Sequence, residues 1–111
     1  MPADSAPFAL VVRFTVLPGS EEAFDALTAA TTTAIRASEP GTLVYACHRV
    51  DQAPQQRIFY ELYRDRAAFD AHEEQPHVRH FLQAREALLE DVAVDFLSLA
   101  DGKTPVAGEA A

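Results

Sequence analysis

The sequence lacks tryptophan altogether and has one cysteine, Cys47, among its 111 residues. A single cysteine can form neither an internal disulfide nor a cysteine-rich zinc site, so the chain fits a reducing compartment and we expect a cytoplasmic location. Basic residues are also few: nine Lys and Arg stand against seventeen Asp and Glu, which gives a net charge of −8. Because phosphate binding depends on clustered cations, neither nucleic acid nor an anionic membrane is an expected partner.

Long hydrophobic runs are missing as well. The longest apolar stretch runs from Phe8 to Val12, far short of the roughly 18 residues that span a bilayer, and the first residues carry no positive charge typical of a secretory signal. Neither membrane insertion nor secretion is therefore expected. The composition, 49% hydrophobic and 23% charged, is that of an ordinary globular protein, and the length suits one domain. We expect that domain over residues 8–100, between flexible tails at 1–7 and 101–111.

Hydrophobic periodicity predicts strands and helices in alternation. Phe8–Leu17 alternates apolar residues with the period of a strand, and Pro18-Gly19 ends it. Ser20 is a suitable N-cap for a helix that runs to about Ser38, and Pro76 suits the first turn of a later helix. The remaining elements are predicted from β-branched residues, turn residues and apolar stripes. These are the strand Thr42–Val50, the loop Asp51–Gln56, the strand Arg57–Arg64, the short helix Arg66–Glu73, the helix Pro76–Leu89 and the strand Val92–Leu99.

This order, β-α-β-β-α-β with the second helix broken in two, is that of an α+β ferredoxin-like fold, in which helices cover one face of the sheet. Alternate residues of the third predicted strand point to opposite faces, and large apolar groups fall on both. One face receives Phe59, Glu61 and Tyr63, and the other receives Ile58, Tyr60 and Leu62. An apolar face outside the helix layer normally marks an interface, so we expect two copies to pack sheet against sheet as a homodimer.

The polar residues that stand out lie close together in the chain, between residues 61 and 80. They are Glu61, Tyr63, His72, His77 and His80. If Glu61 points toward the helices, it could share with His72 a cavity that is apolar with a few convergent polar groups, the usual form of a small-molecule site. Desolvation there would raise the pKa of the carboxyl group and make it a base near neutral pH.

Each of these residues also has a purely structural interpretation. Glu61 could pair with Arg49 or Arg57 across the hairpin, because buried charges are normally paired. His72 could be a cation at the C-terminus of its helix, where it would interact favourably with the helix dipole. The two later histidines, three residues apart, could simply face solvent.

Motifs for metals, covalent catalysis and nucleotide cofactors are missing. The three histidines have no zinc-site spacing, and a helix break separates the first from the other two. Cys47 and His48 are neighbours on a strand, so their side chains point to opposite faces. The four glycines form no phosphate-binding loop. We therefore expect no metal and no cofactor, and we assign no role to His48 or His80.

Three segments carry a more specific signal. They are Val16-Leu17-Pro18-Gly19, the turn Glu39-Pro40-Gly41, and above all Tyr60-Glu61-Leu62-Tyr63 with Phe69, His72, His77 and Phe81 at set intervals after it. Together they resemble the antibiotic biosynthesis monooxygenase (ABM) domain family over about residues 8–100. The resemblance implies a ferredoxin-like fold that dimerises into an α+β barrel with one pocket per subunit. Many members are cofactor-independent oxygenases that act on quinols, anthrones and similar electron-rich phenols.

The resemblance also implies roles for individual residues. Glu61 and His72 would form the acid/base pair, and Tyr63 and His77 would orient the phenol oxygen. A small aromatic substrate and O2 would meet in a pocket lined by Phe59, Phe69, Phe81 and Val12.

Some features of the family are missing from this chain. Val12 stands where haem-degrading relatives have an asparagine, and the lack of tryptophan argues against haem degradation and anthrone oxidation alike. A quinol-type monooxygenase is therefore the expected function. Two others stay open: an isomerase of a small carbonyl compound, which would use the same acid/base pair without O2, and a non-catalytic ligand-binding dimer.

Overall fold

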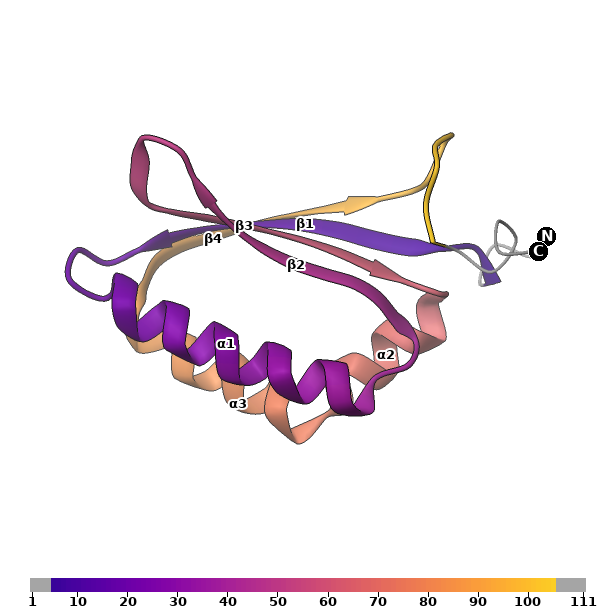
Figure 1. The fold of residues 1–111 in the computed structure, drawn as a ribbon, viewed down its shortest axis with the longest axis horizontal. Coiled ribbons are helices and arrows are strands. Elements are labelled where there is room, and N and C mark those ends of the chain that lie inside the picture. The colour runs from indigo at the N-terminus through magenta and orange to yellow at the C-terminus, as the bar shows by residue number, and fades with distance from the viewer. Residues whose placement is uncertain (1–4, 106–111) are drawn as a thin grey trace.

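The computed structural model describes residues 5–105, so the parts of the expected tails at residues 1–4 and 106–111 lie outside the described residues. Within the described part of the chain, no helix is long and apolar enough to cross a membrane. Figure 1 shows two layers, a sheet and a set of helices. The elements in chain order are β1 (Phe8–Val16), α1 (Glu21–Ser38), β2 (Thr42–Val50), β3 (Ala53–Tyr63), α2 (Arg66–Glu74), α3 (Pro76–Ala84) and β4 (Leu89–Leu97).

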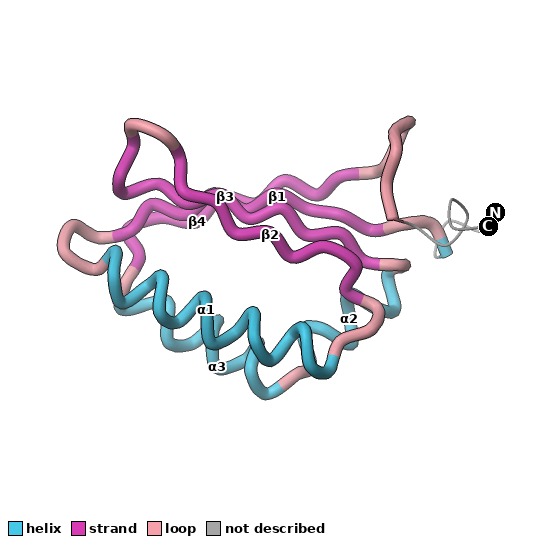
Figure 2. The backbone as a smooth tube through the Cα atoms, viewed as in Figure 1, coloured by secondary structure: helices cyan, strands magenta, loops and turns pink. Residues whose placement is uncertain are grey.

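The strands form one antiparallel sheet in the order β2-β3-β1-β4. On the central strands, Leu10 of β1 pairs with Glu61 of β3 on one side and with Phe96 of β4 on the other. The helices α1, α2 and α3 all lie against one face of the sheet, and in the described part of the chain the opposite face carries no helix (Figures 1 and 2). This arrangement is the α+β ferredoxin-like fold with a broken second helix that the order of elements predicts.

One predicted loop is wrong. The segment expected to be a loop over Asp51–Gln56 is a tight turn, because β3 already begins at Ala53. The turn is made by Gln52, whose φ of 64° is the left-handed conformation that such short hairpins need. Pro54 favours a loop in the sequence, but it is the second residue of β3, and proline is tolerated close to the start of a strand.

The predicted boundary between the last helix and the last strand is also wrong. The helix expected to reach Leu89 ends at Ala84, and a single 3₁₀ turn over Arg85–Ala87 follows it. β4 begins at Leu89, three residues before the predicted start, and it ends at Leu97 rather than Leu99. An apolar stripe at helical spacing cannot reveal where a helix gives way to a half-buried strand, because both bury the same residues.

The core lies between the sheet and the helices. Four alternate residues of β1 face the helices and are buried: Leu10, Val12, Phe14 and Val16. The ring of Phe14 lies between those of Phe24 on α1, Phe59 on β3 and Phe81 on α3, at centroid distances of 5.2, 4.5 and 6.3 Å. Aromatic contacts of this kind stabilise the fold by more than the burial of apolar area alone, so this cluster of four rings holds the sheet and the helices together.

The helix α2 approaches the start of β2 closely. A Cβ atom on Gly41 would lie 2.7 Å from the Cβ of Ala68 on α2, so only glycine fits at this position. Asp65 caps the helix, accepting a hydrogen bond of 2.8 Å from the Ala68 backbone N–H. The Arg64 N–H donates to the Gly41 carbonyl oxygen at 2.9 Å. These contacts hold α2, and with it His72, against the turn between α1 and β2.

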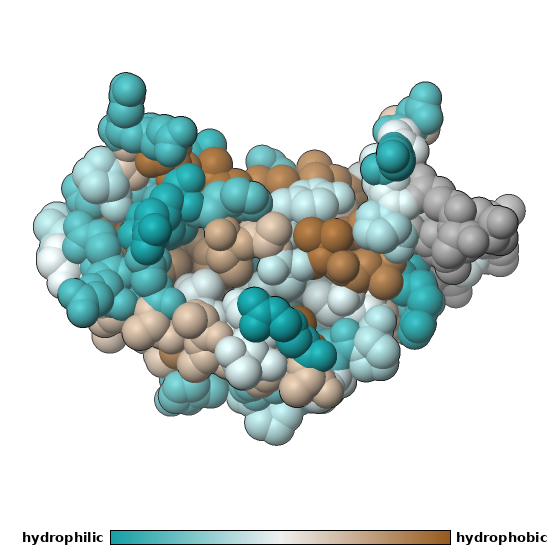
Figure 3. All heavy atoms as spheres, viewed as in Figure 1, coloured by the Kyte–Doolittle hydropathy of each residue, from teal (hydrophilic) through white to brown (hydrophobic). Residues whose placement is uncertain are grey.

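The outer face of the sheet, away from the helices, carries apolar side chains that one chain leaves partly exposed. Five of them are half-buried: Val11, Val44, Ala46, Ile58 and Tyr60. The register places Tyr60 at the middle of this group, paired with Val11 on one side and Ala46 on the other. Figure 3 shows hydrophobic residues along the upper rim, where this face is seen edge-on.

Candidate active site

A cavity of about 320 Å³ lies between the sheet and the helices α2 and α3. Most of its wall is apolar or aromatic. On the side of the edge strand β4 the wall is formed by Val94 and Phe96, which are 44% and 65% exposed, so the cavity opens there. Its polar lining residues are Tyr45, Glu61, His72, Glu73 and Arg85. An apolar cavity with a few convergent polar groups is the usual form of a small-molecule site.

Glu61 contributes a buried carboxyl group to this cavity. The residue lies on the helix-facing side of β3 and is 6% exposed. The Tyr63 hydroxyl donates a hydrogen bond of 2.6 Å to Oε1. Burial raises the pKa of Glu61 to about 7, because the hydrogen bond from Tyr63, which favours the anion, offsets only part of the lost hydration. The carboxyl group can therefore accept or release a proton near neutral pH.

Glu61 does not make the cross-strand ion pair that is its structural alternative. Arg57 instead binds Asp25 of α1 through two hydrogen bonds of 2.8 and 3.1 Å. Arg49 also contacts Asp25, at 3.3 Å. Both arginines are thus drawn to the same acid of the helix layer, and within residues 5–105 Glu61 makes no ion pair.

His72 lies in the last turn of α2 and is 4% exposed. Its Nδ1 atom lies 2.7 Å from Oε1 of Glu39, the residue that follows α1. His77 reaches the other oxygen of the same carboxylate, with Nε2 2.5 Å from Oε2. The structure thus brings His72 to the same cavity as Glu61, but its hydrogen-bond partner is a different carboxylate.

The other predicted site residues divide into two groups. Val12, Phe69 and Phe81 line the cavity with Glu61 and His72. The lining does not include Phe59, Tyr63 or His77. Phe59 lines a separate groove of about 780 Å³ between α1 and β2. Tyr63 is fully buried and contacts Glu61, and His77 contacts Glu39.

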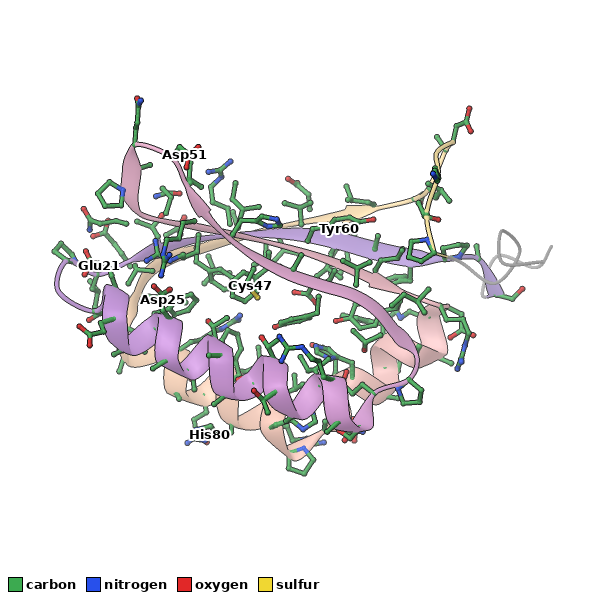
Figure 4. All side chains as sticks on the ribbon, in the orientation of Figure 1. Glu21, Asp25, Cys47, Asp51, Tyr60 and His80 are labelled. Atoms are coloured by element: carbon green, nitrogen blue, oxygen red, sulfur yellow. The ribbon has the colours of Figure 1, made fainter. Side chains whose placement is uncertain are left out.

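Two histidines without an assigned role lie away from the cavity. His80 is exposed on the outer side of α3 and points away from the sheet (Figure 4). His48 is exposed on β2, and its Nδ1 lies 3.2 Å from the Ile58 carbonyl oxygen. Cys47 faces the gap between α1 and β2 in Figure 4, on the other side of the strand from His48. Within residues 5–105, no three His, Cys, Asp or Glu side chains are grouped to hold a metal ion.

Sequence reasoning missed four polar groups at or next to the cavity: Glu39, Tyr45, Glu73 and Arg85. The sequence places Glu39 only in a turn, although an acid at a helix C-terminus is itself a signal, because the helix dipole disfavours it there. Arg85 lies within the predicted helix Pro76–Leu89 at the spacing of its apolar stripe, where a cation is equally unusual. Its guanidinium lies over the rings of Phe14 and Phe81, 5.6 and 5.8 Å from their centroids, and burial lowers its pKa.

The fold and the cavity define a small α+β ferredoxin-like domain with an acid-bearing pocket between its sheet and its helices. The sequence matches the family model described as antibiotic biosynthesis monooxygenase over residues 7–84, which is more than half of the chain. The protein therefore belongs to this family, as the resemblance of its motifs indicates.

Solved structures share this fold. A protein from Pseudomonas aeruginosa is 30% identical, with a TM-score of 0.79 over 90% of this chain and 100% of that chain. A protein from Mycobacterium tuberculosis is also 30% identical, with a TM-score of 0.82 over 89% and 100%. A structure named antibiotic biosynthesis monooxygenase is 21% identical over 85% and 99%, and its TM-score of 0.78 supports the fold alone. None of the curated proteins compared with the chain matches it.

The raised pKa of Glu61 predicts a pH-dependent stability. Because the folded-state pKa of about 7 lies above the 4.5 of an ordinary glutamate, the contribution of Glu61 to stability is complete below pH 4.5 and is lost as the pH rises through 7. Relative to Glu61→Gln, the free energy of unfolding of the wild type should fall by about 3 kcal/mol between pH 4.5 and 8, measured by urea denaturation. A constant difference across this range would contradict the raised pKa.

Proposed function

We propose that the protein is a cofactor-independent monooxygenase that oxidises a small electron-rich phenol or quinol with O2. The observation that supports this best is the cavity itself, where a carboxyl group with a pKa of about 7 and a histidine lie among aromatic side chains. Ground-state O2 reacts slowly with closed-shell molecules, but a phenolate can donate an electron to it directly. The protein then has to take the phenol proton, exclude water and admit oxygen.

The proposed reaction balances without any other reductant. The Glu61 carboxylate takes the proton of the phenol hydroxyl, and the phenolate gives one electron to O2. The resulting radical and superoxide combine at a ring carbon to form a peroxide anion, which takes the proton back from Glu61. His72 then removes the hydrogen on that carbon as a proton while the O–O bond breaks. The hydroxide that leaves combines with this proton to form water, and the other oxygen atom remains as a new carbonyl group.

Three features of the cavity suit this chemistry. Arg85 is the cation among its lining residues and would stabilise the phenolate and the peroxide anion. The aromatic walls formed by Phe69, Phe81 and Phe96 suit a flat ring. A volume of about 320 Å³ is at the small end of ligand pockets, which favours a substrate of one or two rings.

Oxygen uptake tests this function. With a panel of hydroquinones and phenols, the wild type should consume O2 above autoxidation, and kcat/KM should rise with pH through about 7 as Glu61 ionises. Glu61→Gln and His72→Gln should each lower kcat/KM by about 10²–10⁴-fold, as expected for the loss of a general acid/base group. The matched control is His80→Gln, at an exposed histidine, and it should keep full activity.

Two results would overturn the proposal. One is the lack of uptake above autoxidation with every compound in the panel. The other is turnover of a carbonyl compound that persists under strict anaerobiosis and depends on the same two residues, which would support the isomerase instead. Intact ligand affinity in Glu61→Gln and His72→Gln, with no activity in any form, would indicate a non-catalytic binding protein.

We also propose that the protein is a homodimer that packs through the outer face of the sheet. The half-buried group around Tyr60 supports this, because an apolar sheet face of this kind is normally covered by another protein surface. A second copy is the simplest cover, since the same patch on two chains is self-complementary about a two-fold axis.

Light scattering tests the dimer. The wild type at micromolar concentration should have about twice the 12.1 kDa mass of one chain. Tyr60→Glu should dissociate it, because two carboxylates would be desolvated at the interface. Gln83→Glu adds a charge at an exposed position of α3 and should stay dimeric. A monomeric wild type, or a Tyr60→Glu variant that remains dimeric, would contradict the proposal.

A further inference from the structure

Glu39 occupies a position that is unfavourable for a carboxylate for two reasons. It follows the last residue of α1, where the helix dipole presents its negative end. Its side chain is also only 4% exposed, so the charge has lost most of its hydration. A carboxylate in such a place needs hydrogen-bond donors from the protein.

Three donors surround it. The Thr42 hydroxyl donates to Oε1 at 2.7 Å, His72 Nδ1 lies 2.7 Å from the same oxygen, and His77 Nε2 lies 2.5 Å from Oε2. Burial alone would raise the pKa of Glu39, but the hydrogen bonds from Thr42, His72 and His77 outweigh it and lower the pKa below its ordinary value. Glu39 is therefore an anion near neutral pH, and an anionic carboxylate can only accept hydrogen bonds.

This fixes the tautomers of two histidines. Because Glu39 only accepts, His72 must carry a hydrogen on Nδ1 and His77 must carry one on Nε2. When its ring is neutral, His72 then has its lone pair on Nε2. That atom has no hydrogen-bond partner within residues 5–105, and the residue lines the cavity.

Aromatic rings hold the imidazole of His72 in this orientation. The ring centroids of Tyr45, Tyr63 and Phe69 lie 5.6, 5.1 and 6.4 Å from that of His72. Packed on these sides and hydrogen-bonded to Glu39, the ring cannot turn over without breaking the contact to a buried charge.

We propose that Glu39 is a positioning residue, which holds His72 as the Nδ1–H tautomer so that Nε2 is the proton acceptor in the cavity, and which neutralises the imidazolium that forms there. The catalytic part of this role rests on the proposed oxygenase function, while the tautomer does not. In the reaction, His72 Nε2 takes the proton from the ring carbon, and the positive charge that appears lies beside Glu39. His77 binds the other carboxylate oxygen and keeps the group in place.

Other titratable groups face His72 and have to be considered with it. Glu61 and Tyr63 face it from β3, and Tyr45 from β2. Glu73 and Arg85 line the same cavity from the helix layer. In the described part of the chain, Glu39 is the group that makes a hydrogen bond to the His72 ring, so its effect on the tautomer is separable from these longer-range charges.

The test is the ¹⁵N NMR spectrum of the uniformly labelled wild-type protein. Long-range ¹H–¹⁵N correlations distinguish a protonated ring nitrogen from one with a lone pair. At a pH where the rings are neutral, His72 should be the Nδ1–H tautomer and His77 the Nε2–H tautomer. The exposed His80 should show the tautomer mixture of a free imidazole. An Nε2–H tautomer for His72 in the wild type would overturn the proposal without any variant.

Glu39→Gln changes the hydrogen-bonding groups that face the rings of His72 and His77. The amide offers one acceptor oxygen and one donor nitrogen, so one of the two histidines must change its tautomer. If this variant does not fold, His77→Gln serves, since its amide N–H can still donate to Glu39 and His72 should keep the Nδ1–H form. The control is Glu74→Gln, a surface acid paired with Arg79, which should leave every tautomer unchanged. Unchanged tautomers in folded Glu39→Gln would overturn the proposal.

Kinetics separate this inference from the proposed function. With an oxidised phenol, Glu39→Gln should lower kcat/KM by about 10–100-fold, the usual loss when a group that orients a functional histidine is removed. If the protein shows the predicted tautomers but oxidises no phenol, the proposed oxygenase function is wrong and the positioning of His72 by Glu39 still holds. Phenol oxidation by a protein whose His72 is the Nε2–H tautomer would do the reverse.

Discussion

Two carboxylates are almost completely buried at the cavity, one lining it together with His72 and the other hydrogen-bonded to His72, and the number of hydrogen-bond donors around each decides its charge. Glu39 has three donors, which outweigh its loss of hydration, so it remains an anion. Glu61 has one, the Tyr63 hydroxyl, and burial raises its pKa to about 7. One group is a fixed charge and the other can exchange a proton near neutral pH. The division of roles proposed for the cavity depends on this difference.

The fold carries the two carboxylates on different elements, so that Glu61 shares a cavity with His72 and Glu39 binds His72 from the side of α1. Glu61 lies on an inner strand of the sheet, and Glu39 lies in the turn that leads from α1 into the edge strand β2. The close contact between Gly41 and Ala68 brings α2 to that turn. All of the groups are therefore carried by regular elements or by a short turn packed against one, which is the kind of support that a precise site requires.

The fold and one half of the site were predictable from the sequence, because both depend on local patterns. Alternation along β3 puts Glu61 on the same face as Phe59, and the order of elements puts helices over that face. The hydrogen bonds of His72 were not predictable in this way. Glu39 lies 33 residues before His72 and 38 before His77, and it reads locally as the first residue of a turn. Only tertiary structure brings the three together.

The same limit explains the errors at the ends of the strands. A turn of two residues and a longer loop both suit Pro54 and its polar neighbours, and the choice of Ala53 as the start of β3 depends on pairing with β2. The roles of Tyr63 and His77 also shift for this reason. Each contacts a carboxylate instead of lining the cavity, so their proposed influence on the substrate passes through Glu61 and Glu39.

The opposite pKa shifts of the two buried glutamates can be measured directly by ¹³C NMR of the side-chain carboxyl carbons, titrated from acid to alkaline pH. Glu61 should titrate with a midpoint near 7, and Glu39 should already be ionised at the pH where exposed glutamates titrate. If both titrate together with the exposed glutamates, or if Glu39 takes up a proton near neutral pH, the assignment of a proton acceptor and a fixed charge to this cavity is wrong.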